Sequence, residues 1–184
     1  NNNNNNNNNN CGPGHDVLRA RGLVLLGVCH SISLGVGSFD SIGSVTGPSA
    51  LVPGNVVALH SDGRFLRVME NNAMVDSCGE CAVGSLSFDW NHERFLVVDA
   101  ASDGMVAFYG VAKCCFLGMD GEGRLVASER LRIGDCPRPK ETFQVRTEDN
   151  GSVSLYSPVL DTCYDSPFQV VQIQGFQKAI IGRY

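Results

Sequence analysis

The sequence predicts an all-β protein, and three observations carry that prediction. Short stretches in which apolar residues alternate with polar ones recur along the chain, as in half-buried strands. Dipeptides of Asp or Asn followed by Gly separate these stretches, and primed β-hairpin turns prefer such dipeptides. The chain contains 21 glycines in 184 residues, which suits many tight turns, and we find no convincing amphipathic helix.

The residues from 54 onward recur approximately three times, which narrows the prediction to a β-trefoil. Strands expected at 56–59, 105–108 and 152–155 open the three units. The strands that contain Phe95 and Phe143 close the first and second units, 48 positions apart, and Phe168 lies in the third unit. Three pseudo-repeats of about four strands each predict a barrel capped by hairpins. A β-sandwich is the alternative, but nothing in a sandwich requires threefold recurrence.

The chain divides into three expected segments. Residues 1–16 form an Asn-rich tail that should be disordered, because its ten consecutive Asn carry no packing information. Residues 17–53 have the basic, apolar and small-residue order of a secretory signal peptide followed by an extension; the alternative is a strand or loop packed on the domain. The apolar run is too short to span a bilayer, so we expect no membrane insertion. Residues 54–184 form the β-trefoil domain.

The middle of the chain shows the expected elements most clearly. We expect strands at 106–109, 115–117 and 125–128, with a hairpin turn formed by Asp120-Gly121 and the residues up to Gly123. The recurring Phe and Leu side chains should fill the barrel, and each contributes roughly 1.5–3 kcal/mol when buried. They are Phe65, Leu66, Phe95, Leu96, Phe116, Leu117, Phe143 and Phe168.

Composition and charge disfavour several classes of partner and cofactor. The net charge is −5, the pI is about 5.3, and Lys and Arg form no long run, so nucleic acid is an unexpected partner. Among eight cysteines only Cys78 and Cys81 have ligand or redox spacing. A structural zinc site would need a second pair, so we expect no metal or other cofactor; a Cys78–Cys81 disulfide is the alternative in an oxidising compartment.

Candidate catalytic residues do not form a recognisable constellation. The histidines at positions 15, 30, 60 and 92 are scattered, and none lies in a nucleophile or zinc motif. We therefore expect a binding protein rather than an enzyme.

Three segments carry a family resemblance. Gly123, Leu125, Ala127 and the pair Asp135-Cys136 stand at the spacings of a signature, and residues 60–67 and 175–180 match its opening hairpin and C-terminal segment. The sequence resembles a divergent member of the fibroblast growth factor family. That resemblance implies a β-trefoil that is secreted and binds the extracellular domain of a receptor tyrosine kinase.

The same resemblance implies two sets of binding residues. Receptor contacts would lie at Val56, Gln144 and Asn150. A heparan sulfate site would include Gln177, Lys178 and Ala179. Few Lys or Arg accompany Lys178, and sulfated chains are held by clusters of basic residues, so we expect weak heparin binding. The chain also departs from the family pattern: four extra residues precede Gln144, and Gly151 stands where the signature has Tyr.

Two other trefoil classes compete with the growth-factor interpretation. Intracellular fascin-like trefoils have similar repeats, and ricin-type carbohydrate binders share the architecture but usually carry Gln-x-Trp in each repeat, whereas Trp90 is the only Trp of this chain. Secretion is favoured by residues 17–37 and by one glycosylation sequon, Asn150-Gly151-Ser152. Asn-Gly is equally what a hairpin turn requires.

Overall fold

The protein is an antiparallel β structure throughout the part that the computed structural model describes, residues 43–69, 75–77, 81–86, 90–100, 104–128 and 136–173. Strands and 3-10 helices make up its regular structure, and these ranges contain no α-helix, so the all-β prediction is confirmed. The strands are β1 (Gly43–Val45), β2 (Val56–Ser61), β3 (Arg64–Val68), β4 (Val75–Ser77), β5 (Phe95–Asp99), β6 (Met105–Gly110), β7 (Cys115–Met119), β8 (Leu125–Ala127), β9 (Phe143–Thr147), β10 (Val153–Ser157), β11 (Thr162–Cys163) and β12 (Gln169–Ile173). The 3-10 helices are η1 (Gly47–Ala50), η2 (Val83–Ser85) and η3 (Pro139–Glu141).

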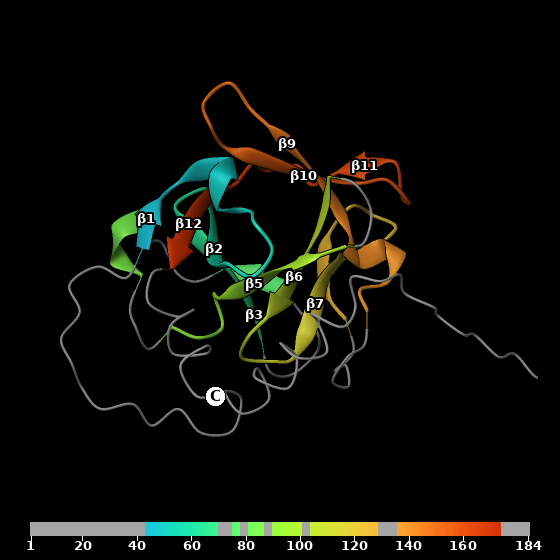
Figure 1. Cartoon of the computed structure of the whole chain (residues 1–184), viewed down its shortest axis with the longest axis horizontal. Helices are drawn as coiled ribbons and strands as arrows, with labels where there is room; N and C mark the ends of the chain where they lie inside the picture. Colours follow the sequence, from blue (N-terminus) through green and yellow to red (C-terminus); the bar gives the residue numbers. More distant parts are fainter. Residues whose placement is uncertain are drawn as a thin grey trace, which may run out of the picture.

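Six strands form a curled sheet that closes on itself. The order of hydrogen-bonded neighbours runs β12-β2-β5-β6-β9-β10. An isolated bridge between Val153 and Phe168 joins β10 to the residue before β12, with N–H···O=C distances of 2.8 and 2.7 Å. Figure 1 shows these strands in succession around the interior.

Long and short pairings alternate around this ring. Three extended pairings, β12 with β2, β5 with β6, and β9 with β10, alternate with shorter junctions. Each junction pairs a Phe with a Val: Phe95 with Val57, Phe143 with Val106, and Phe168 with Val153. The three Phe residues that the sequence repeats identified therefore occupy equivalent positions around the ring.

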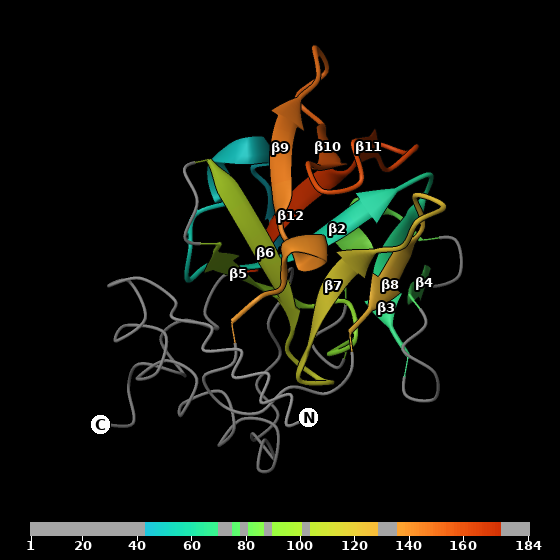
Figure 2. The same ribbon diagram turned by 90° about the vertical axis from the view of Figure 1, so that its right-hand side faces the viewer.

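The remaining strands lie off the ring. β3 pairs with β2 and β4, while β7 pairs with β6 and β8. β11 pairs with β10, and β1 pairs with β12. Figure 2 shows β3, β4, β7 and β8 side by side, with the β9–β10 hairpin projecting away from them.

Apolar side chains from all six ring strands fill the interior of the ring. Phe95, Phe108 and Phe143 are fully buried there, and the ring centroids of Phe108 and Phe143 are 6.2 Å apart. Such close-packed aromatic contacts stabilise a core beyond the area they bury. All eight side chains predicted to fill the barrel are buried, but only Leu66, Phe95, Leu117, Phe143 and Phe168 belong to this interior cluster. Phe65, Leu96 and Phe116 are buried in a second cluster, so the prediction was wrong about where these three side chains pack.

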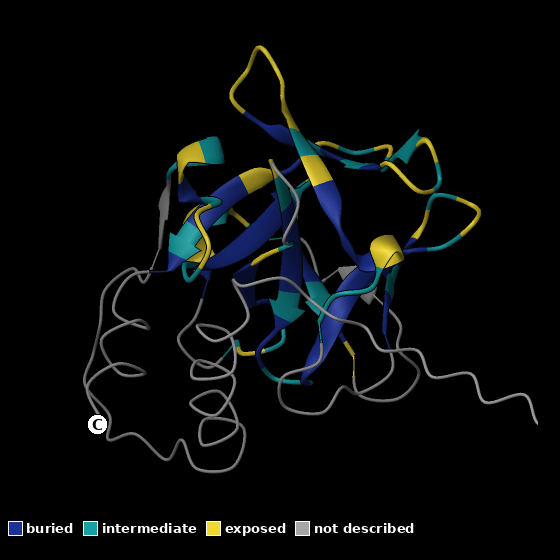
Figure 3. Cartoon of the chain, turned by 45° about the vertical axis from the view of Figure 1, so that its right-hand side comes forward, coloured by how far each residue is buried: buried dark blue, intermediate teal, exposed yellow. Residues whose placement is uncertain are grey.

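The outer face of the ring is covered along one part and open along another. Val56, Ala58, Leu96 and Val171 point outward from β2, β5 and β12 and form a second buried cluster together with Phe65 of β3. In β9 and β10 the outward residues are polar and exposed or half-buried. Figure 3 shows exposed residues along this hairpin and at its tip. Covered strands are apolar on both faces, whereas open strands alternate.

Three local features differ from the sequence-based expectation. In the β7–β8 turn the left-handed residue is Gly123 (φ 79°) rather than Gly121, because the Asp120 side chain accepts hydrogen bonds from the N–H groups of Glu122 and Arg124 and winds the turn. The third unit shows three strands among the described residues; the segment before β12 contains Pro167, which has no N–H to donate. Sequence analysis placed the start of the domain at residue 54, whereas β1 and η1 lie before it and β1 pairs with β12.

Candidate binding surface

A row of four side chains crosses the open part of the outer face. Gln144 of β9 lies opposite Met105 of β6 on one side and opposite Tyr156 of β10 on the other, and Tyr156 lies opposite Cys163 of β11. Directly opposed residues of an antiparallel pair project from the same face. Gln144 is exposed, and the other three side chains are half-buried.

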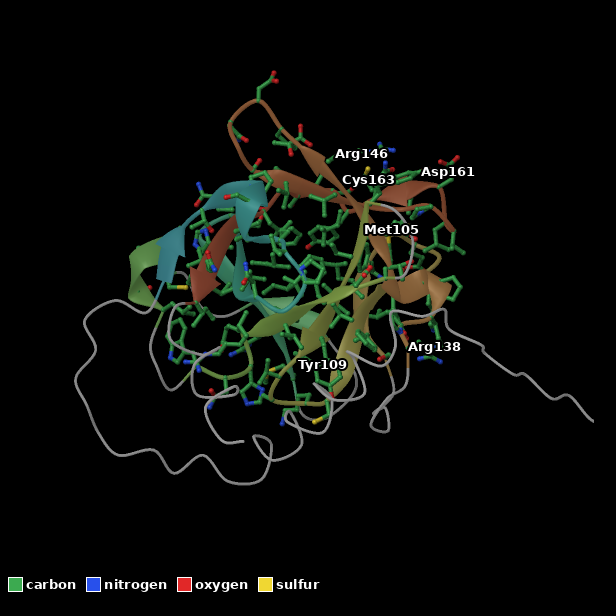
Figure 4. All side chains as sticks on the ribbon, viewed as in Figure 1. Met105, Tyr109, Arg138, Arg146, Asp161 and Cys163 are labelled. Atoms are coloured by element: carbon green, nitrogen blue, oxygen red, sulfur yellow. The ribbon has the colours of Figure 1, made fainter. Side chains whose placement is uncertain are left out.

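Arg146 and Asp161 complete this surface through contacts with Tyr156 and Cys163. The guanidinium carbon of Arg146 lies 3.8 Å from the centre of the Tyr156 ring, and its Nη1 is 3.6 Å from Sγ of Cys163. The hydroxyl of Tyr156 donates to Oδ1 of Asp161 at 2.6 Å. We call these six residues, Met105, Gln144, Arg146, Tyr156, Asp161 and Cys163, the Tyr156 face; Figure 4 shows Arg146, Asp161, Cys163 and Met105 on the same side of the ribbon.

Two contacts restrain Tyr156: Arg146 lies over the face of its ring, and Asp161 accepts a hydrogen bond from its hydroxyl. Its hydrogen bond to Asp161 raises the pKa of the phenol above its usual range, and partial desolvation and the negative charge of Asp161 act in the same direction. Asp161 adopts a left-handed conformation (φ 51°) in the β10–β11 turn, which Asp tolerates better than most residues. The turn thus places a carboxylate where it fixes the tyrosine hydroxyl.

The composition of the Tyr156 face is that of a protein-binding surface. Tyr, Arg and Met are enriched at the centres of protein–protein interfaces, and Tyr and Arg dominate binding energy there. Since the ring of Tyr156 and the guanidinium of Arg146 already restrain each other, less conformational entropy is lost when a partner contacts them. Within the described ranges Arg146 makes no ion pair, so its charge is available to a partner.

The β9–β10 hairpin extends beyond this face as a polar tip. Glu148 accepts a hydrogen bond from the Ser154 hydroxyl. At the tip, the N–H of Gly151 donates to the carbonyl of Glu148 at 2.9 Å, and Gly151 has φ 80°. The turn therefore needs glycine at position 151.

The structure separates the residues that sequence analysis assigned to a receptor. Gln144 lies between Met105 and Tyr156 and is the exposed member of the row of four, and Asn150 is exposed at the hairpin tip. Val56 is 1% exposed and pairs with Leu96 in the covered part of the sheet, so its side chain cannot contact a partner. Gln177, Lys178 and Ala179 lie outside the described residues.

Sequence analysis missed Tyr156 and Arg146. A signal for both was present, because polar residues alternate with apolar ones at 143–146 and 153–156, and the two strands belong to one hairpin. What the sequence lacks is the register, which sets Tyr156 opposite Gln144.

The two histidines in the described part of the chain have structural contacts. His60 lies 3.0 Å from the carbonyl of Cys81 through Nε2, and His92 lies 3.0 Å from the carbonyl of Val68 through Nδ1. Of the Cys78 and Cys81 pair only Cys81 is among the described residues; Cys136 is disulfide-bonded.

The described ranges contain no group of three or more His, Cys, Asp or Glu side chains arranged to hold a metal ion. In those same ranges no helix has the length and hydropathy needed to cross a membrane.

Comparison with known proteins gives little further information. No protein-family model and no curated protein matches the sequence. Among solved structures, one that matches is the Haemophilus ducreyi cytolethal distending toxin, with 15% sequence identity over 65% of this chain and 72% of that chain and a TM-score of 0.47. A similarity this low supports no conclusion about the fold or the function.

Proposed function

We propose that this chain is a secreted, non-catalytic β-trefoil that binds a protein partner through the Tyr156 face. Two features support the trefoil. The six-strand ring alternates extended pairings with short junctions, and the junction residues Phe95, Phe143 and Phe168 repeat in both sequence and space. The β3–β4 and β7–β8 hairpins follow the opening strands of the first two units, as hairpin caps of a trefoil would.

The observation that carries the binding proposal is the row Met105–Gln144–Tyr156–Cys163. The ring is covered on its outside over β2, β5 and β12, yet these four residues of neighbouring strands remain uncovered or half-covered. A Tyr and an Arg held in place on an uncovered part of the outer face suit recognition of another protein surface rather than turnover of a small molecule.

For the partner, we propose the extracellular domain of a receptor tyrosine kinase. The support is the resemblance to fibroblast growth factors together with the central position of Gln144, which that resemblance assigned to the receptor. Heparan sulfate binding should be weak at most, because the net charge is −5 and basic residues are scarce near Lys178.

Carbohydrate binding is a second candidate, favoured by one observation. The ring of Tyr164 stacks on Phe168 with 5.3 Å between centroids, and its pKa is raised by burial and by the negative charges of Asp62 and Asp165. The face of Tyr164 that is not stacked on Phe168 would offer an apolar surface to a sugar ring, and carboxylates in the vicinity could accept hydrogen bonds from its hydroxyls.

Binding of the purified full chain to a panel of immobilised receptor tyrosine kinase ectodomains, alongside a neutral glycan array, tests the proposal. We expect one or more ectodomains to bind, and Gln144→Ala, Tyr156→Ala or Arg146→Ala to weaken that binding by about 1 kcal/mol or more. Arg64→Ala is the matched control, because Arg64 is also an exposed arginine on a strand but lies in β3. Retention on heparin at high salt, abolished by Lys178→Ala, would contradict the expected weak heparin affinity.

Two results would overturn the proposal. Absence of binding to every ectodomain, with glycan binding lost in Tyr164→Ala, would favour the carbohydrate candidate. Equal losses for Arg146→Ala and Arg64→Ala would show that the Tyr156 face is not the interface.

A further inference from the structure

At the tip of the β9–β10 hairpin, hydrogen bonds from Ser152 hold the side chain of Asn150 in one orientation. Asn150 is exposed, and its Oδ1 accepts two hydrogen bonds from Ser152, one from the backbone N–H at 2.9 Å and one from the hydroxyl at 2.6 Å. Ser152 itself is buried. Among the described residues, Nδ2 of Asn150 has no hydrogen-bond partner, so the amide nitrogen remains available while its carbonyl oxygen is fixed.

This arrangement joins the two chemical groups that N-glycosylation requires. A hydroxyl two residues after the Asn, with any residue but Pro between them, defines the acceptor sequence. The Ser152 hydroxyl donates to the carboxamide oxygen, which draws electron density from the amide and makes its N–H more acidic. The sequence contains one such acceptor, Asn150-Gly151-Ser152.

We propose that Asn150 is an N-glycosylation site. In the reaction, Nδ2 attacks the anomeric carbon of an oligosaccharide carried on a polyprenyl diphosphate. The polyprenyl diphosphate is the leaving group. Nδ2 loses one proton, and a β-N-glycosidic bond replaces the bond from the sugar to the diphosphate. The transferase and its lipid-linked donor belong to the secretory pathway, so the inference rests on the secretion that we propose for the chain.

The position of Asn150 suits a bulky modification. It lies beyond the end of β9 at Thr147, and an added Cβ at the adjacent Gly151 would meet nothing within 4 Å. Along the hairpin Arg146, the nearest residue of the Tyr156 face on β9, is four positions away and Gln144 is six, which corresponds to roughly 13 and 20 Å at the rise of a strand. A glycan would therefore leave the centre of the Tyr156 face open, and Asn150 would carry the glycan instead of contacting the receptor.

Cell-free translation in the presence of microsomes tests the site directly. The full chain is fused to a cleavable heterologous signal peptide, and its mass is compared before and after peptide-N-glycosidase F. Asn150→Asp is the control variant, because Asp retains an oxygen for the two Ser152 donors but has no amide nitrogen to glycosylate. Thermal unfolding of unglycosylated wild type and Asn150→Asp, both made in bacteria, should give midpoints within a few degrees.

We expect wild-type chain to carry one glycan that the enzyme removes, with conversion of Asn150 to Asp detected by peptide mass spectrometry in heavy-oxygen water. Asn150→Asp and Ser152→Ala should carry none. A translocated wild-type chain with no glycan would overturn the inference and leave the receptor proposal intact. A glycan on the wild type together with no ectodomain binding would support the site and count only against the proposed function.

Discussion

Replacing Phe143 with Ala tests whether the repeated Phe residues hold the ring together. Phe143 is fully buried, its ring lies 6.2 Å from Phe108, and its backbone pairs with Val106 at a short junction. Truncation of a buried Phe removes its transfer free energy and leaves a cavity, which together cost roughly 3–5 kcal/mol. In a domain of this size that loss corresponds to a fall in Tm of about 6–20 °C.

Urea unfolding followed by fluorescence measures this free energy. The midpoint should fall while the m-value stays constant, because the variant loses stability without a change in the surface that unfolding exposes. Gln144→Ala is the matched control, because Gln144 is the next residue in β9 and points to the open face; its effect should stay within about 0.5 kcal/mol. A loss below about 1 kcal/mol for Phe143→Ala, or equal losses for the two variants, would refute the assignment of Phe143 to the core.

Three more predictions concern the second unit. Asp120 accepts hydrogen bonds from backbone N–H groups of its own turn, which lowers its pKa; Asp120→Ala should therefore reduce stability at neutral pH, and the difference from wild type should shrink as the pH falls through that lowered pKa. Burial, followed by the neighbouring thiol, raises the pKa of Cys115 to about 11, so iodoacetamide at pH about 8 should modify half-buried Cys163 well before Cys115, and equal rates by peptide mapping would contradict this. Gly118→Ala should cost roughly 1–3 kcal/mol in urea unfolding, because an added Cβ would stand 3.2 Å from a backbone carbonyl of η3, whereas Gly121→Ala meets nothing within 4 Å and should be nearly neutral.

The all-β class and several strands could be predicted because their signals are local or repeated. The strands around Phe108, Phe116 and Leu125 and their turn follow from alternation and turn residues, and the recurrence of Phe95, Phe143 and Phe168 marked buried positions. The position of the left-handed residue in the β7–β8 turn did not follow, because it depends on which N–H groups the Asp120 side chain reaches.

The candidate surface was predicted only in part. Gln144 came from a resemblance, and the structure leaves it exposed beside Tyr156. Val56 came from the same resemblance, yet its strand is apolar on both faces and a second buried cluster covers it. Whether an outward residue is open or covered depends on segments distant in sequence, such as the strand that carries Phe65, and alternation within one strand cannot reveal that.

The pairing of β2 with β12 has a consequence for synthesis of the chain. His60 lies opposite Gln169, so β2 cannot pair with β12 until almost all of the domain has left the ribosome. Until then β2 offers an apolar strand edge to any neighbouring chain, and such edges favour aggregation. Loop closure over this span also slows folding relative to local hairpins. A nascent chain that stops before Phe168 should therefore remain bound to chaperones, whereas one released beyond Ile173 has every strand of the ring.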